Sequence, residues 1–403
     1  MKRFFQKGIG AFQGRTAADR ELTRWMPQRL LVPLYPQGAG LIAPGTLVKK
    51  YTRLGENGGF APEKGVVQGY QEMNHPLLGK VLCAVMELNP DESGREHGRK
   101  NGKKMLSPAD IIRIAREFAI IEECSGEFLW KRLEMWRQEK RTLMAADLLE
   151  DDRGDTAVPA FYRKKKDAIK KGLQYAAEAA GMKEKRIAWN TRALEKDVPP
   201  ELSLPLPLEK RYPAWVLYQN RTGRQAALVG IQALAALAEA IEQGVPPVWT
   251  AVRVAGEAVP QAKNLLVPVG TPVASLLEFC GAGSLPCQAV MGSAFTGFTV
   301  PDGDTAVTVT TRSITTWKNQ EEQLEGEDFP CIGCGKCREA CPMGLEPWVV
   351  QEALGQDPVP QEMLWRVEEC CQCGVCRAVC PSGIDLTACM KQAMELRKRG
   401  GVE

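Results

Sequence analysis

Two copies of one cysteine motif near the C-terminus constrain this chain more than any other feature. The first copy has the spacing C-x2-C-x2-C-x3-C, is followed by proline, and comprises Cys331, Cys334, Cys337 and Cys341. The second copy repeats that spacing and the proline, and comprises Cys370, Cys373, Cys376 and Cys380. A disulfide framework would instead spread its cysteines through a small secreted chain. The pattern therefore indicates metal binding in a reducing compartment.

This spacing holds [4Fe-4S] clusters in two-cluster ferredoxins, where three cysteines of one copy bind one cluster and the fourth binds the other. We assign the first cluster to Cys331, Cys334, Cys337 and Cys380. We assign the second cluster to Cys370, Cys373, Cys376 and Cys341. The neighbouring Cys371 falls out of register, so we expect it to remain a free thiol.

Structural zinc is the alternative, because two C-x2-C pairs can supply four thiolates. Zinc ribbons usually separate their pairs by about a dozen residues or more, and they need neither a third cysteine nor the C-P ending. Iron-sulfur clusters are therefore the favoured interpretation. Proline and glycine positions between the copies predict two short helices over 346–369 and a mostly helical domain.

The chain of 403 residues is too long for one small core, so several domains are expected. Residues 28–98 follow a leader at 1–27, are rich in Gly, Pro and strand-forming residues, and predict a small β-barrel or sandwich. Residues 104–245 alternate helical segments with short apolar pieces, as in a layered α/β domain. Residues 246–318 predict a compact α+β module of strands and one helix.

Charge and hydropathy exclude some classes of function. The 52 basic residues nearly balance the 49 acidic ones, which argues against a nucleic-acid partner. The N-terminus lacks the apolar core of a secretory signal. The apolar stretch 226–241 contains Gln232 and Glu239 and is shorter than the roughly 18 apolar residues of a span, so we predict one buried helix there. We expect a cytoplasmic protein that reaches any membrane through its partners.

The order of these parts resembles the RnfC family of the Rnf electron-transport complex. The resemblance rests on both cysteine motifs, on VRVAGEAVPQAKNLLVPVGTPVASLLEFCG (252–281), and on FQGRTAADRELTRW (12–25) with LVKKYTRLGE (47–56). It implies a barrel-sandwich hybrid at 28–98, a Rossmann-like domain at 104–245, a soluble-ligand-binding β-grasp module at 246–318 and a dicluster ferredoxin-type domain at 319–403. Members of this kind take electrons from NADH through FMN and pass them through two clusters to a partner.

The sequence departs from that family at the nucleotide site. Members that bind FMN carry a turn of the type G-G-x-G-x-P-T, whose glycines let backbone amides approach a phosphate closely. The corresponding segment here, ECSGEFLW (123–130), keeps Gly126 but adds Glu123 and Glu127. The later family segment N-G-x-E-C-E-P is replaced by AADLLEDDRGD (145–155). Carboxylates would repel a phosphate, so we expect two [4Fe-4S] clusters and no FMN.

Three functions are open at this point. The favoured one is a relay of single electrons through the two clusters between redox partners, without an NADH site and without a catalytic residue of its own. The partners would be ferredoxin-, flavoprotein- or reductase-type proteins, or other subunits of a membrane complex. The second is an FMN-dependent NADH dehydrogenase with a cryptic flavin site around Gly126. The third is a scaffold in which the clusters are mainly structural.

Overall fold

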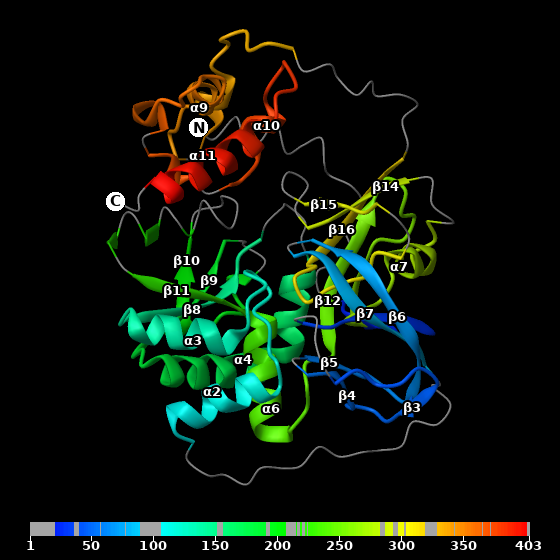
Figure 1. Ribbon diagram of the computed structural model, residues 1–403. Helices are drawn as coiled ribbons and strands as arrows, with labels where there is room; N and C mark the ends of the chain where they lie inside the picture. Colours follow the sequence, from blue (N-terminus) through cyan, green and yellow to red (C-terminus); the bar gives the residue numbers. More distant parts are fainter. Residues whose placement is uncertain are drawn as a thin grey trace.

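The computed structural model describes residues 21–35, 40–56, 58–76, 78–88, 106–150, 156–190, 194–206, 215, 218–219, 222–223, 225–282, 287–292, 297–301, 304–318, 329–341, 343–364, 366–370 and 372–400. Cys371 and the segments 12–20 and 151–155 lie outside these residues. The described chain forms several sheets with covering helices and a separate helical region at the C-terminus (Figure 1). The predicted multidomain, mixed α/β class is confirmed.

The first sheet is antiparallel and is built from the N-terminal part of the chain. Its strand order is β2 (Arg29–Pro33), β7 (Gly79–Leu88), β6 (Gly65–His75) and β3 (Thr46–Val48). A two-stranded ribbon, β4 (Arg53–Gly55) and β5 (Gly58–Phe60), lies beside it. Strand β2 is buried over four of its five residues because both this sheet's core and the neighbouring module cover it.

The second sheet is entirely parallel and has helices packed around it. Its order is β10 (Ser203–Pro205), β9 (Glu184–Trp189), β8 (Leu143–Leu148) and β11 (Ala226–Gly230). The helices are α2 (Pro108–Glu117), α3 (Leu129–Gln138), α4 (Ala157–Ala180) and α6 (Ile231–Gln243). All six residues of β8 are buried, as expected for a central parallel strand covered on both faces.

The stretch 226–241 corrects our prediction of a single helix. Its first five residues form strand β11, which pairs with β8, and the helix α6 begins only after Gly230. Helix α6 packs very closely on α4, because a Cβ atom added to Gly172 would lie 1.9 Å from the carbonyl oxygen of Leu234. Small residues therefore set the distance between these two helices.

The third sheet has the order β1 (Thr23–Arg24), β13 (Lys263–Pro268), β12 (Trp249–Gly256), β16 (Ser313–Lys318), β14 (Cys287–Met291) and β15 (Phe298–Thr299). Helix α7 (Val273–Phe279) covers one face through Val273, Leu276 and Leu277. The edge strand β1 comes from the range expected as a leader and runs parallel to β13.

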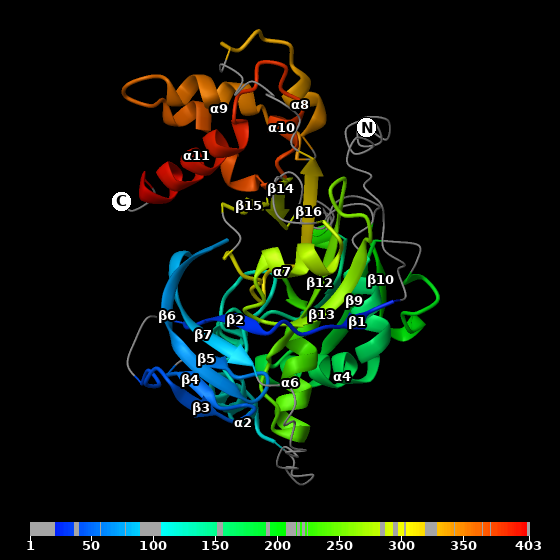
Figure 2. The ribbon, with the colours of Figure 1, turned by 90° about the vertical axis from the view of Figure 1, so that its right-hand side faces the viewer.

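The C-terminal region is helical and contains both cysteine motifs. It comprises α8 (Lys336–Ala340), α9 (Pro347–Leu354), η5 (Gln361–Leu364), η6 (Val367–Glu369), α10 (Val375–Ala378) and α11 (Leu386–Gly400). Figures 1 and 2 show these elements, orange to red, gathered at one end of the molecule. Its small core includes Val350, Leu364 and Met390. No helix in the described ranges has the length and hydropathy needed to cross a membrane.

Candidate functional site

The two cysteine motifs adopt the same local structure. In each, a loop carrying two cysteines turns into a short helix that carries the third. Gly335 and Gly374 precede these helices with φ of 71° and 74°, and Gly344 and Gly383 follow the fourth cysteines with φ of 66° and 74°. These angles lie in the left-handed region that glycine adopts without steric strain. The duplicated glycines therefore explain how both motifs reach the same shape.

Cysteines from both motifs meet around one pocket. Cys341 of the first copy lines it together with Cys370, Cys373 and Cys376 of the second. Most of its remaining lining is apolar and includes Met343, Leu345, Pro347 and Met390. This is the set of four thiols that we assigned to the second cluster.

The surroundings of these thiols fit a cationic group such as an iron cluster. Burial raises the pKa of Cys370 to about 11 and that of Cys376 to about 12, and it also raises the pKa of Cys341. A thiolate in such an apolar place needs a positive centre beside it. Iron bound by all four sulfurs would supply that charge.

Several polar groups point at the sulfurs of this set. The backbone N–H of Leu345 donates to Cys341 Sγ over 3.3 Å, and that of Gln372 donates to Cys370 Sγ over 3.4 Å. The hydroxyl of Thr387 lies 3.9 Å from Cys376 Sγ. Hydrogen bonds of this kind stabilise negative charge on a metal-bound sulfur and so tune its potential.

The other four cysteines lie nearer the surface. Cys331 and Cys334 are exposed, while Cys337 is buried. Two hydrogen bonds hold the start of the first motif beside the end of the second: the N–H of Phe329 donates to Ser382 O over 3.2 Å, and Ser382 Oγ donates to Pro330 O over 3.1 Å. The chain that follows Cys380 is thereby kept next to the chain that precedes Cys331. In the described residues, no three His, Cys, Asp or Glu side chains form a group suited to one metal ion.

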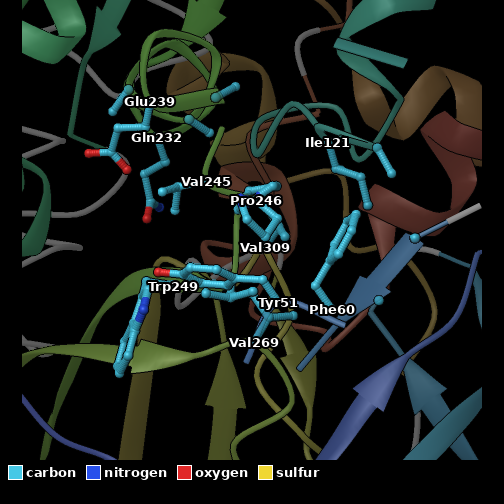
Figure 3. Close-up of a pocket in the computed structure, with 18 of the residues that line it drawn as sticks. Tyr51, Phe60, Ile121, Gln232, Glu239, Val245, Pro246, Trp249, Val269 and Val309 are labelled. Atoms are coloured by element: carbon cyan, nitrogen blue, oxygen red, sulfur yellow. The ribbon is translucent and has the colours of Figure 1, made fainter. Parts of the chain in front are cut away.

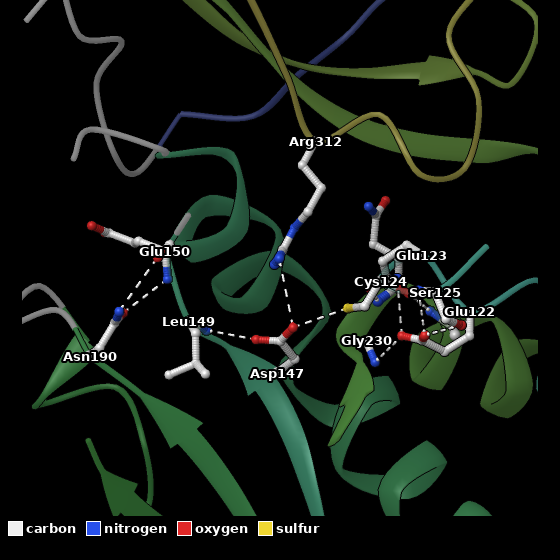
Figure 4. A network of polar contacts seen from close by, with 12 residues as sticks. Glu122, Glu123, Cys124, Ser125, Asp147, Leu149, Glu150, Asn190, Gly230 and Arg312 are labelled. Carbon is white, nitrogen blue, oxygen red and sulfur yellow. Dashed lines mark hydrogen bonds and ion pairs between the residues drawn. The ribbon is translucent and has the colours of Figure 1, made fainter. Parts of the chain in front are cut away.

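The loop that replaces the phosphate-binding turn is filled by its own carboxylates (Figure 4). Glu123 accepts hydrogen bonds from the backbone N–H groups of Gln232 (2.6 Å) and Ala233 (2.9 Å), at the start of helix α6. Glu122 accepts one from the N–H of Gly230 (2.8 Å). A helix N-terminus is a favourable place for an anion, and here two side chains of the chain itself occupy it. A cofactor phosphate does not fit at the same amides.

These carboxylates belong to a buried polar network that crosses between two modules. Asp147, at the end of β8, is fully buried and accepts a hydrogen bond from Cys124 Sγ over 3.0 Å. Its other carboxylate oxygen accepts from the N–H of Leu149 over 3.0 Å. Arg312, which precedes β16 of the third sheet, forms an ion pair with Asp147 at 3.7 Å. The network therefore ties the parallel sheet to the third sheet (Figure 4).

A separate cavity of about 310 Å³ lies where the first sheet, helix α6 and the third sheet meet. Aromatic rings of Tyr51, Phe60 and Trp249 line one side, and Gln232 and Glu239 lie on the opposite side (Figure 3). Its lining includes no cysteine and none of the acidic residues of the filled loop. The cavity is thus distinct from both candidate cluster sites.

Sequence reasoning missed Glu122, Asp147 and Arg312. A signal was present for Asp147, because it is an acidic residue within the apolar run of strand β8. Cys83 and Cys280 are buried, as we predicted. The basic residues of 163–171 are largely engaged within the chain, as in the ion pair of Lys165 with Glu239 at 2.5 Å.

The motifs and their geometry define a protein with a domain for two iron-sulfur clusters. Residues 330–384 match the family of 4Fe-4S dicluster domains, so both predicted clusters are confirmed as cofactors. An RnfC-type subunit of the proton-translocating ferredoxin:NAD(+) oxidoreductase complex of Clostridium ljungdahlii is 24% identical to this chain, over 80% of this chain and 75% of that protein. Its counterpart in the ion-translocating oxidoreductase complex of Vibrio cholerae is also 24% identical, over 86% of this chain and 50% of that protein.

These similarities confirm the predicted resemblance to the RnfC proteins. This chain spans three quarters of the Clostridium protein but only half of the Vibrio protein. Among solved structures, an NAD+-reducing [NiFe]-hydrogenase in the air-oxidized state matches 72% of this chain and 63% of its own, with 11% identity and a TM-score of 0.47.

Proposed function

We propose that this protein is an electron-transfer protein that relays single electrons through two [4Fe-4S] clusters between redox partner proteins. The observation that carries this proposal is the pocket lined by Cys341, Cys370, Cys373 and Cys376, which unites both motifs around one centre. When bound, the clusters would supply one-electron redox chemistry. The protein holds them with thiolates and tunes them with N–H groups such as that of Leu345.

The two clusters would be held close together by the crossed cysteines. Cys341 leaves helix α8 to reach the second site, and Cys380 leaves helix α10 to reach the first. Each short helix therefore connects two sites, which favours rapid transfer between them. A purely structural role would not require the two sites to share the same helices.

The relay would lack a flavin and an NADH site of its own. The support for this part is the loop of Glu122 and Glu123, whose carboxylates take the amides of Gly230, Gln232 and Ala233. Electrons would then arrive from a docked protein. The names of the relatives favour a place in a membrane oxidoreductase complex, which this chain would join through partner proteins on the cytoplasmic side.

Anaerobic reconstitution followed by cofactor analysis tests the proposal. We expect about eight irons per chain, the content of two four-iron clusters, together with reduction of the clusters by dithionite and no bound flavin. One tightly bound FMN with bleaching of the clusters by NADH would establish the dehydrogenase alternative instead. Clusters that dithionite and reduced ferredoxin both fail to reduce would favour the scaffold alternative.

A further inference from the structure

We propose that the surface around Cys331 and Cys334 is the port at which a redox partner docks, and that this partner presents an uncharged, apolar rim around its own redox centre. This inference rests on the proposed electron-transfer function. It locates the exchange of electrons at the first cluster rather than the second.

Two large apolar side chains are exposed beside these thiols. Ile332, which lies between the two ligands, is 67% exposed, and Phe329 is 58% exposed. Both values exceed those of the other large hydrophobic side chains with high exposure in the described part of the chain, Leu41, Leu47 and Leu78. Exposed apolar side chains that cluster at a functional site mark a contact surface.

The exposure of Phe329 does not result from a loose backbone. Its N–H donates to Ser382 O over 3.2 Å, and the next residue, Pro330, accepts from Ser382 Oγ over 3.1 Å. The backbone is held against the second motif while the ring projects outward. The position of Phe329 is therefore defined by the fold and would be available to a partner.

The duplicated motif provides an internal comparison. In the second copy, Glu368 stands where the first has Phe329, and Cys371 stands where the first has Ile332. Because both copies form the same loop and helix, the loop itself does not require large apolar residues at these positions. The apolar pair therefore has a role that is specific to the surface of the first copy.

The charges nearby are balanced within the chain. Arg338 pairs with Glu346 at 3.0 Å, and its counterpart in the second copy, Arg377, pairs with Asp385 at 3.1 Å. The other charged residues of helix α8, Lys336 and Glu339, have opposite signs. Such a surface matches an apolar partner rim better than a strongly acidic or basic one.

The second cluster site is less accessible to a partner. Its four cysteines line an apolar pocket under Met343, Leu345 and Met390, whereas Cys331 and Cys334 are exposed. An approaching protein would come closest to the first site. Electrons would then enter or leave there, and the second cluster would continue the path inside the protein.

Substitution of both apolar residues tests the port. The variant combines Phe329→Ser with Ile332→Ser, a second variant carries Ile332→Ser alone, and the matched control combines Leu47→Ser with Leu78→Ser on the first sheet. Stopped-flow bleaching of the clusters would be followed with a reduced two-cluster ferredoxin as the probe. Iron content, cluster EPR spectra and reduction by dithionite would be recorded for every protein.

We expect the double variant to lose about tenfold in the second-order rate with ferredoxin, because about 1.4 kcal/mol of apolar contact corresponds to that factor. The control should keep the wild-type rate, and the wild-type rate should change little between about 50 mM and about 500 mM salt, since screening weakens only charged contacts. A double variant that reacts at the wild-type rate overturns the port alone. Wild-type clusters that dithionite cannot reduce overturn the proposed function and, with it, the port.

Discussion

The carboxylate of Glu123 accepts a hydrogen bond of 2.9 Å from the backbone nitrogen of Ala233 in the first turn of helix α6. Together with the bond from Gln232, it satisfies amides that a helix would otherwise offer to an external anion. The chain thus provides its own anion at this place. Gly230 is suited to this arrangement, because a Cβ atom there would lie 2.0 Å from the Glu123 carboxyl carbon.

Removal of this carboxylate should open an anion site. In Glu123→Ala the amides of Gln232 and Ala233 lose their partner, so inorganic phosphate should stabilise the variant and not the wild type. Phosphate at about five times its Kd would add about 1 kcal/mol, a shift of a few degrees in the melting temperature. The control is Glu127→Ala, whose carboxylate is exposed and pairs with Arg132. Equal stabilisation of all three proteins by phosphate would contradict this account.

Glu123 should also make stability depend on pH. Burial and the neighbouring Glu122 raise the pKa of Glu123 to about 7, against the opposing effects of Arg312 and the helix amides. The folded protein then holds a proton that the unfolded chain releases above the ordinary value of 4.5. The contribution of Glu123 to stability is thus complete below that value and is lost as the pH rises to about 7, by at most about 1.4 kcal/mol per pH unit.

Denaturant unfolding between pH 4.5 and pH 7 would measure this contribution. In Glu123→Gln the decline of stability over this interval should flatten, because the side chain no longer titrates. Glu127→Gln, at an exposed position, should keep the wild-type profile. A profile of Glu123→Gln that matches the wild type would show that Glu123 keeps an ordinary pKa.

The crossed assignment of the cysteines predicts how double substitutions combine. Cys341→Ser and Cys370→Ser should damage the same cluster, so their combination should still retain about four irons, the content of one cluster. Cys331→Ser combined with Cys370→Ser should lose both clusters. Cys371→Ser should leave both intact. Iron analysis and EPR spin counting would decide, and loss of both clusters in Cys341→Ser with Cys370→Ser would refute the crossing.

Helix packing beneath the parallel sheet should tolerate no added volume at Gly172. Alanine there would place its Cβ 1.9 Å from Leu234 O, so α4 and α6 would have to separate. We expect Gly172→Ala to lower the free energy of unfolding by about 1 to 3 kcal/mol, the usual range for overpacking. Thermal unfolding would measure it, with Gly69→Ala as the control because its Cβ would meet nothing within 4 Å. Similar melting temperatures for both variants would argue against a close contact.

Much of the cluster region could be predicted from the sequence. The spacing of the cysteines, the glycines beside them and the prolines between them are local signals, and local geometry follows from them. The short helix α9, which starts at Pro347 and is capped by Gly355, lies where the proline and glycine positions predicted it. Alternating patterns also indicated the layered α/β domain at 104–245. These features depend on neighbouring residues along the chain.

Other features were decided only by tertiary contacts. The run AALVG at 226–230 has no period that separates strand from helix, and it became β11 because β8 offered a parallel partner. The sequence alone suggested that Glu123 would repel a phosphate, but only the fold brought its carboxylate to the start of α6, more than a hundred residues away. Likewise, the repeat determined which cysteines bind iron, whereas burial decided which cluster faces a partner. Hydrogen bonds and solvent exposure depend on distances between remote segments, and those distances exist only once the chain has folded.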